Sequence, residues 1–411
     1  MTPPGLLRQS VQVPRTPVRS DEPGTVLVAH PSAECYGSDL QMLETVRACV
    51  EDGSDVVVTV PVDGPLVPLL RAAGARVLLM DVPVLRRALL NPAGLLRLAL
   101  SSWTALRDQR RMVRRVGATA LVVNTVTIPT WLLTGWLTGV PTVCHVHEAE
   151  DQGPRLVRTL LAAPLLFADR VVVNSRASLE ALTRVLPRLR ARARVVHNGV
   201  AGPVTPVPPA RQRVAADPAV VVLVGRLSPR KGTDVALAAV ATLRRQGRDV
   251  RLVLAGTAFA GYEWFVQELR ERARAQDLDG AVEFLGYADR WECFARADVV
   301  LVPSRAEPFG NVAVEAMLAG RPVVASRVQG LVEVVRDEVD GHLVEPGDAE
   351  QLALGIARVL DDPARAGSMA ERARRAAQER FAPEAYKSAL RAEIAESSAA
   401  VRRVARSRRT Q

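Results

Sequence analysis

The feature that most constrains the fold of this chain is a regular alternation of short β-branched runs with segments of helical spacing. Residues 25–29 and 56–60 have the composition of strands, and residues 38–52 between them carry apolar side chains spaced for one buried helix face. Such alternation is typical of parallel βαβ units. Further strand-like runs follow at residues 120–123, 142–146, 171–173 and 195–197. The pattern predicts a doubly wound α/β domain over residues 24–200.

A proline-rich segment interrupts this pattern. Four prolines between positions 203 and 209 exclude both a helix and a central strand, so residues 201–212 are expected to form a linker. The alternation then resumes in the runs 220–224, 251–255, 282–285, 299–302 and 322–325. A second doubly wound domain is therefore predicted over residues 213–380, followed by a helix at 381–398. The length of 411 residues suits two such domains.

The two ends of the chain have a different character. Residues 1–23 carry charges and prolines without a continuous apolar core, so they are expected to be a disordered tail rather than a signal peptide. Residues 399–411 are basic and are likewise expected to be disordered. The most apolar internal stretch, 128–144, is broken by prolines and glycines and is short for a bilayer span. A cytoplasmic protein without a transmembrane helix is the expectation.

Charge and cysteine content limit the classes of partner. A net charge of +10 fits anionic partners in general, from nucleotides to acidic lipid headgroups or nucleic acid. The aromatic content of 4% disfavours a surface that stacks single-stranded bases. Four widely separated cysteines, without metal-ligand spacing, predict reduced thiols and no metal site.

Residues that follow the strand-like runs carry the candidate chemistry, because doubly wound sheets bind ligands at the carboxyl ends of their strands. Gly225 and Arg226 follow the run 220–224, and Lys231 precedes an expected helix. Two cations and a helix N-terminus suit a diphosphate. Two solvated charges in a basic protein are the plain alternative.

A second candidate block, residues 303–316, follows the run 299–302. Glu307 is expected on a loop and Glu315 inside the following helix. Gly310 permits close backbone approach, and the N–H groups of Phe309, Gly310 and Asn311 are expected to be free at the helix start. Carboxylates and N–H groups of this kind can bind sugar hydroxyls. Solvated glutamates favoured by the helix dipole are the alternative.

The whole second half is similar to a known family. The run 224–232 (VGRLSPRKG), Gly256, the triplet 284–286, the block 303–316 and the segments 320–325 and 341–347 resemble the family 4 retaining glycosyltransferases of the GT-B fold. The resemblance covers roughly residues 24–390. It implies two Rossmann-like domains facing a central cleft, an N-terminal acceptor domain, a C-terminal donor domain and a nucleotide-diphosphate sugar as donor. Such enzymes generally need no metal or other cofactor.

The resemblance also assigns expected roles. Arg226 and Lys231, next to Gly225, would hold the donor diphosphate, Glu315 the donor ribose and Glu307 the transferred sugar. The backbone of Phe309, Gly310 and Asn311 would bind sugar hydroxyls and phosphate. The backbone near Leu285 would border the base.

The N-terminal half matches the family more weakly. Only Gly37 remains of a loop that usually carries two adjacent glycines, since Ser38 takes the second place. His147 occupies the position of a histidine that faces the transferred sugar. His145 and His147 as a metal pair are the alternative hypothesis, although no third ligand is apparent. The turn at 197–199 resembles a structural turn of the family.

These observations favour retaining sugar transfer to a glycan, a lipid-linked or a small-molecule acceptor. A GT-B enzyme of other chemistry, such as a sugar-nucleotide epimerase or phosphorylase, remains open, as does a non-catalytic anion- or nucleic-acid-binding protein. No nucleic acid is expected as a partner of the enzyme.

One further pattern concerns membranes. Arg107, Arg110, Arg111, Arg114 and Arg115 would form one basic stripe on a helix. With the apolar residues 95–103 before it, the stripe predicts peripheral contact with an anionic membrane. An ordinary amphipathic helix with solvated arginines is the alternative.

Overall fold

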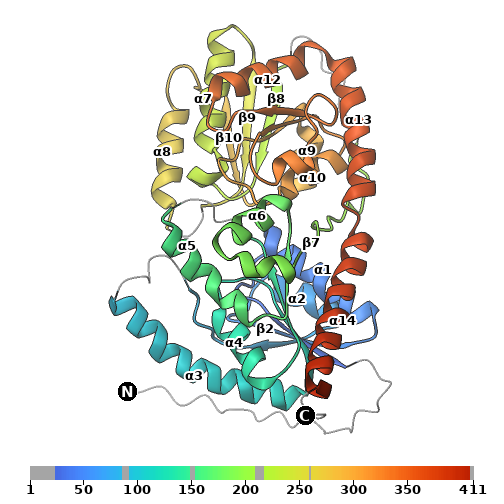
Figure 1. Ribbon diagram of the computed structural model, residues 1–411. Helices are drawn as coiled ribbons and strands as arrows, with labels where there is room; N and C mark the ends of the chain where they lie inside the picture. Colours follow the sequence, from blue (N-terminus) through green and yellow to red (C-terminus); the bar gives the residue numbers. More distant parts are fainter. Residues whose placement is uncertain (1–23, 86–91, 149–152, 209–216, 259–260, 408–411) are drawn as a thin grey trace, which may run out of the picture.

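The computed structural model describes residues 24–85, 92–148, 153–208, 217–258 and 261–407, which form two α/β domains stacked end to end (Figure 1). Each domain is built on one sheet whose strands all pair in parallel. Two such sheets, with helices on their faces, confirm the predicted fold class: two doubly wound Rossmann-like domains.

The sheet of the N-terminal domain has seven strands in the order β3-β2-β1-β4-β5-β6-β7. The strands are β1 (Thr25–Ala29), β2 (Asp55–Val60), β3 (Arg76–Leu79), β4 (Ala118–Val123), β5 (Thr142–Val146), β6 (Arg170–Val173) and β7 (Ala193–Val195). The valine-rich central strands are buried on both faces, as parallel sheets require. The strand order reverses between β1 and β4, which makes their carboxyl ends the switch point of this domain.

The C-terminal sheet has six strands in the order β10-β9-β8-β11-β12-β13. The strands are β8 (Ala219–Val224), β9 (Val250–Ala255), β10 (Val282–Gly286), β11 (Val299–Val302), β12 (Val323–Ser326) and β13 (His342–Val344). Here the order reverses between β8 and β11. The two runs that precede the candidate site residues are therefore neighbours at the switch point. Strands β3 and β13 are the two that sequence reasoning missed, and both lie at an edge of their sheet.

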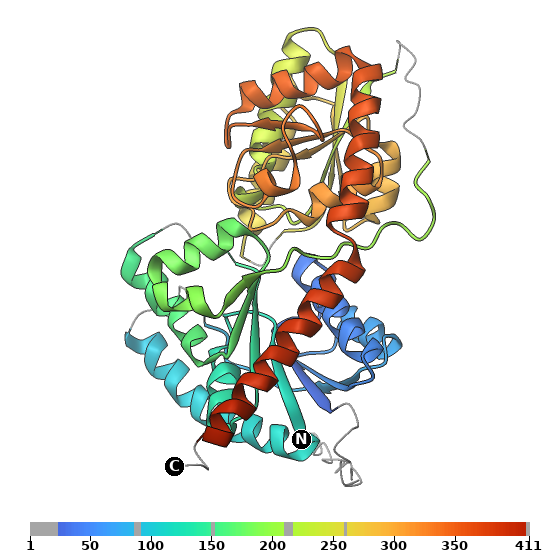
Figure 2. The ribbon, with the colours of Figure 1, turned by 45° about the vertical axis from the view of Figure 1, so that its right-hand side comes forward.

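Helices cover both faces of each sheet (Figures 1 and 2). Those of the N-terminal domain are α1 (Gly37–Glu51), α2 (Leu66–Ala72), α3 (Pro92–Val116), α4 (Pro129–Thr138), α5 (Arg155–Ala162) and α6 (Arg176–Val185). Those after the linker are α7 (Thr233–Arg245), α8 (Glu263–Ala273), α9 (Arg290–Arg296), α10 (Asn311–Leu318), α11 (Leu331–Val334), α12 (Ala349–Asp361), α13 (Pro363–Arg380) and α14 (Pro383–Ser407). None of the helices in the described part of the chain is long and apolar enough to cross a membrane.

The last helix, α14, leaves the C-terminal domain and packs across the N-terminal one (Figure 2). Tyr386 and Leu390 are buried in a small core against Val143 of β5 and Val172 of β6. The Tyr386 hydroxyl lies 2.6 Å from Oγ1 of Thr45 on α1. The final residues of the chain therefore complete the domain that the first residues begin.

The sequence-based end of this helix at residue 398 is wrong, because α14 continues to Ser407. Residues 399–407 of the expected disordered tail are helical, since alanine and arginine are strong helix formers and extend a helix that packing has already nucleated. The predictions for residues 1–23, 209–212 and 408–411 lie outside the described residues.

Shortening Leu390, which is fully buried, should destabilise the N-terminal domain. We expect Leu390→Ala to lower the free energy of unfolding by about 2–5 kcal/mol through lost burial and a residual cavity. Leu354→Ala on α12 is the matched control, because Leu354 is 59% exposed, and it should stay within about 0.5 kcal/mol. Urea denaturation followed by circular dichroism measures both. Equal stabilities of the two variants would contradict the packing of α14.

Candidate active site

The loop after β8 carries the two predicted cations. Gly225 has φ +141°, which a side chain rarely adopts, and a short 3-10 turn then brings Lys231 to the start of α7. Gly232 lies so close to the loop after β11 that a Cβ would meet the carbonyl oxygen of Pro303 at 1.9 Å. The two switch-point loops are therefore in backbone contact, and Lys231 forms an ion pair with Glu307 on the neighbouring loop.

Glu307 is almost fully buried and held from two sides. Besides the ammonium group of Lys231, the hydroxyl of Ser304 donates a hydrogen bond to its carboxylate at 3.2 Å. Burial would raise the pKa of Glu307, but the nearby charges of Lys231 and Arg230 and these hydrogen bonds lower it below the usual range. Glu307 is thus a buried acceptor that stays ionised.

Helix α10 begins directly after this loop. Gly310 stands before its first turn with φ +114°, and a Cβ there would lie 2.5 Å from Leu331. Among the described residues, no acceptor is found for the backbone N–H groups of Gly310, Asn311 and Val312. Free N–H groups at a helix start attract anions and hydroxyl oxygens. Phe309 can offer only its backbone, because its ring is buried against His197 and Phe381.

Glu315 lies one turn into α10 and is also buried. It forms an ion pair with Arg290, at the start of α9. Burial raises the pKa of Glu315, while the guanidinium group opposes the rise. Sequence reasoning missed Arg290, although it follows strand β10 by only four residues and so lies near the same sheet edge.

The N-terminal domain contacts this site across the cleft, at the start of α1. The side-chain amide of Asn311 donates to the carbonyl of Gly37 at 3.3 Å, and a Cβ on Gly37 would lie 3.1 Å from that amide. Close backbone approach therefore survives at Gly37 although Ser38 replaces a second glycine.

The loop that precedes α1 contacts Arg226. Glu34 forms an ion pair with Arg226, whose guanidinium group lies 3.8 Å above the ring of Tyr36. The Tyr36 hydroxyl lies 2.9 Å from Oγ1 of Thr257, which follows β9. Glu34, Tyr36 and Thr257 are site residues that sequence reasoning did not single out. Their partners are roughly 190 or more positions away in the chain, so no local pattern could reveal them.

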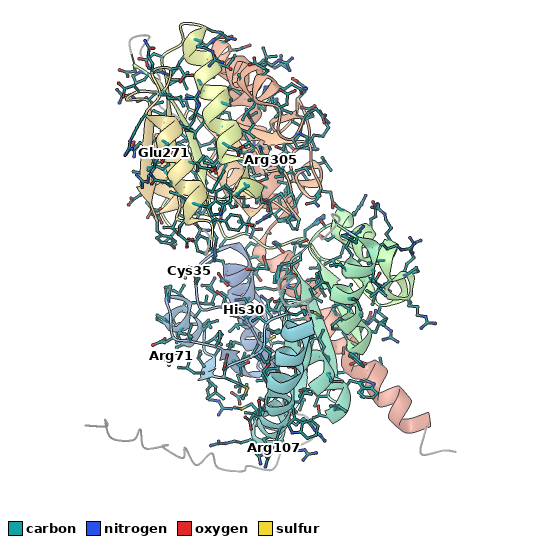
Figure 3. The ribbon with its side chains drawn as sticks, turned by 90° about the vertical axis from the view of Figure 1, so that its left-hand side faces the viewer. His30, Cys35, Arg71, Arg107, Glu271 and Arg305 are labelled. Carbon is teal, nitrogen blue, oxygen red and sulfur yellow. The ribbon has the colours of Figure 1, made fainter. Side chains whose placement is uncertain are left out.

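A cavity lies between these elements. Gly37, Gly225, Asn311 and Glu315 line it among the predicted residues, and Arg290 lines it as well. In Figure 3, Cys35 and His30 mark the place where the two domains meet.

Leu285 does not line this cavity, because its side chain packs against the core beneath α9 and α10. The next aromatic residue, Tyr287, takes the place beside the opening. The expectation that the backbone near Leu285 borders the base stays a prediction.

His147 follows β5 and faces the cleft side of the N-terminal domain, next to His145 with ring centroids 4.1 Å apart. Burial, together with His145 and His30, holds the pKa of His147 well below its usual range. Burial lowers the pKa of His145 to about 3. Both imidazoles are therefore neutral near pH 7. Among the described residues, no third metal-ligating group joins the pair.

The one cluster with ligand-like spacing in the described part of the chain is Asp337, Glu338 and His342, far from the cavity in sequence. Arginines already hold its carboxylates: Arg327 pairs with Asp337, and Arg365 pairs with Glu338 at 2.7 Å. Positive charge at this spot disfavours a cation.

Two Rossmann-like domains whose switch points face each other across a cleft define the GT-B class of nucleotide-sugar enzymes. The model of "Glycosyltransferase Family 4" matches residues 37–201, and that of "Glycosyl transferases group 1" matches residues 208–380. The chain belongs to this family of GT-B glycosyltransferases.

Individual relatives agree with this assignment. The glycogen synthase of Mycobacterium tuberculosis (strain H37Rv) is 34% identical over 60% of this chain and 55% of its own length. The D-inositol 3-phosphate glycosyltransferase of Saccharomonospora viridis is 38% identical over 48% of each chain. The chain thus spans about half the length of the curated relatives it matches.

Solved structures show the same fold. HepE of Anabaena, crystallised with UDP-glucose, has a TM-score of 0.76 and 24% identity over 90% of this chain and 99% of its own. Sucrose-phosphate synthase of Thermosynechococcus elongatus has a TM-score of 0.72 and 23% identity over 92% of this chain and 100% of its own.

The start of α10 allows a test that needs no substrate. Gly310→Ala should lower the free energy of unfolding by about 2 kcal/mol or more, because backbone strain at φ +114° adds to a clash with Leu331. Gly247→Ala is the matched control: its φ is +83°, but nothing lies within 4 Å of the added methyl group. Chemical denaturation compares the two, and a Gly310→Ala variant as stable as Gly247→Ala would contradict the tight packing of this loop.

Proposed function

We propose that this chain is a retaining glycosyltransferase that moves a sugar from a nucleoside diphosphate to a hydroxyl group of an acceptor. The observation that carries the proposal is the cavity between the domains, which Gly225 and the first turn of α10 line from one side and Gly37 from the other. Arg226 directly follows Gly225, and Lys231 ends the short turn that leads into α7. Each cation is held by a carboxylate, Arg226 by Glu34 and Lys231 by Glu307.

A donor diphosphate would replace Glu34 as the partner of Arg226 and would add to the contacts of Lys231. The bond between the anomeric carbon and the phosphate oxygen breaks, and negative charge grows on the departing diphosphate. Fixed cations and helix N–H groups stabilise this charge, which is why the proposal needs no metal. Glu315 would hold the ribose after exchanging its contact with Arg290.

Retention follows from attack on the face that the diphosphate leaves. The acceptor oxygen bonds to the anomeric carbon, and its proton passes to the phosphate oxygen that departs. This route suits a site whose two glutamates are both engaged by cations, Glu307 by Lys231 and Glu315 by Arg290. Neither carboxylate is then a free nucleophile.

The experiment that tests the proposal is a donor screen. UDP, GDP and ADP sugars are added to the purified chain, and the donor that binds should raise the melting temperature by mass action. Product analysis by NMR with the stabilising donor should show a retained anomeric configuration, and excess EDTA should leave the rate unchanged. An isomerised donor would favour an epimerase, and phosphorolysis a phosphorylase. No shift and no transfer with any donor would refute the proposal.

Removing either cation should slow transfer. We expect Arg226→Ala and Lys231→Ala each to lower kcat/KM by about tenfold or more, because charge develops on the bond that breaks. Arg248→Ala is the matched control. Arg248 pairs with Asp361 and stands just before β9, at the amino end of that strand, which lies away from the cleft. Steady-state assays with the donor found above measure all three. Near-normal turnover in both cleft variants would refute the diphosphate assignment.

Helix α3 supports a second proposal, peripheral attachment to an anionic membrane. Its inner face packs on α4, where buried Gln109 bonds Thr130 at 3.0 Å. Trp103 is 76% exposed, and Arg107, Arg111, Arg114 and Arg115 are exposed as well. Figure 3 shows Arg107 at the end of the N-terminal domain that is remote from the cleft. An exposed tryptophan beside arginines fits an interface of anionic lipid.

Charge reversal tests this attachment. The chain should sediment with phosphatidylserine vesicles at low salt, and release should follow as salt screens the contacts. Arg111→Glu with Arg114→Glu should weaken sedimentation. Arg251→Glu with Arg274→Glu makes the same change in net charge on exposed residues of the other domain and should have little effect. Wild-type protein that stays in the supernatant, or equal losses in both variants, would refute the attachment.

A further inference from the structure

A chain of buried polar side chains connects His147 with the loop that precedes α1. His30 follows β1 and Asn124 follows β4, so both stand at the switch point of the N-terminal sheet, while Asp39 belongs to the first turn of α1. The exposed fractions of His30, Asp39 and Asn124 are 3%, 2% and 1%. Buried polar groups of this kind are costly unless each has a partner.

Each of these groups has one. Nε2 of His147 lies 3.0 Å from Oδ1 of Asn124, and Nδ2 of Asn124 lies 3.0 Å from Nδ1 of His30. Nε2 of His30 lies 2.8 Å from Oδ1 of Asp39. The other oxygen of Asp39 accepts the backbone N–H of Tyr36 at 2.9 Å. The chain therefore has four hydrogen bonds and runs from the imidazole of His147 to the backbone N–H of Tyr36.

The direction of the chain is fixed by one further contact. The carbonyl oxygen of Ser38 lies 3.3 Å from Nδ2 of Asn124 and can only accept, so the amide nitrogen must point toward Ser38 and His30. The amide oxygen then faces His147, whose Nε2 must carry the proton. His30 in turn accepts through Nδ1 and donates from Nε2 to Asp39.

This arrangement leaves Nδ1 of His147 with a lone pair, and none of the side-chain hydrogen bonds found among the described residues uses that atom. Burial and the neighbouring His145 hold the pKa of His147 well below its usual range, so a second proton is not gained near pH 7. A neutral imidazole with its proton on Nε2 can accept a hydroxyl hydrogen bond through Nδ1.

The two ends of the chain belong to opposite parts of the site. One end is His147. The other end is the backbone of Tyr36, whose ring lies under Arg226 and whose hydroxyl contacts Thr257 in the donor domain. A network that only filled the core would have no reason to end at both places.

We infer that Asp39, His30 and Asn124 are positioning residues that hold His147 as its Nε2–H tautomer, so that Nδ1 accepts a hydroxyl group of the donor sugar or the acceptor. The inference rests on the proposed function and deepens it. Toward the sugar hydroxyl, His147 is then the acceptor of a hydrogen bond rather than the donor. The inference also couples the orientation of His147 to the loop that contacts Arg226.

The tautomer can be measured without any substrate. The chain has five histidines, so selective ¹⁵N-histidine labelling gives few signals, and His147→Gln and His30→Gln assign two of them. Two-bond ¹H–¹⁵N spectra of the wild-type protein at pH 7 should show His147 and His30 protonated on Nε2. A proton on Nδ1 of His147, or a mixture of both tautomers, would overturn the inference.

Kinetics test the positioning role. Asp39→Asn and Asn124→Ala should lower kcat by roughly tenfold to a hundredfold, since small misplacements of a reacting group have effects of this size. The donor KM should stay within about threefold, because the cation contacts are retained. Gln109→Ala is the matched control: it removes equally buried hydrogen bonds, to Thr130 and Thr134, in the same domain.

The outcomes separate the two proposals. A kcat for Asp39→Asn and Asn124→Ala equal to that of Gln109→Ala would refute the positioning role. An active protein with the Nδ1–H tautomer would refute the inference and leave the proposed function standing. A protein with the expected tautomer that transfers no sugar from any donor would refute the proposed function and the role of His147 with it.

Discussion

The structure depends on one constraint, the parallel pairing of β1 with β4 and of β8 with β11 at the two points where the strand order reverses. At such a point the connections leave in opposite directions, and the carboxyl ends of the strands border a crevice that no helix fills. Backbone and side-chain polar groups there are free to bind a ligand. The protein places two of these crevices face to face, and nearly every polar residue discussed above follows one of their strands by a few positions.

Charge pairing across the crevice follows from this arrangement. Glu34 holds Arg226, Lys231 holds Glu307, and Arg290 holds Glu315, so each charged group of the cavity is neutralised by a partner before any ligand arrives. Burial makes the pairing of Glu307 and Glu315 necessary, because an uncompensated charge at either position would be costly. An anionic ligand can take the place of a carboxylate as the partner of a cation, so these ion pairs can be exchanged for contacts with a ligand. The pair between Glu34 and Arg226 joins two domains, so exchange there would also alter how the domains are held together.

Much of the architecture could be predicted from the sequence alone. The β-branched runs predicted both sheets except the edge strands β3 and β13, and the proline-rich segment predicted the division into two halves. The places of Arg226, Lys231, Glu307 and Glu315 near the carboxyl edge of the second sheet could be predicted, because each stands a short distance from a strand or a helix start, while their roles stay predictions. Arg290 escaped because its partner, Glu315, is 25 residues further on. The end of α14 was misplaced because its terminal arginines suggested a solvated tail.

The information that can be read along the chain is local: which runs become strands, where helices begin, and which residues stand at strand ends. These follow from periodicity, from proline and glycine, and from the reach of a few residues of backbone. Which strand ends meet depends on how the whole chain folds. The same holds for the contact of Tyr36 with Arg226, the return of α14 to the first domain, and the hydrogen-bond chain from Asp39 to His147. Those contacts join residues tens to hundreds of positions apart. Their partners are chosen by sheet order and domain packing, which no local pattern encodes.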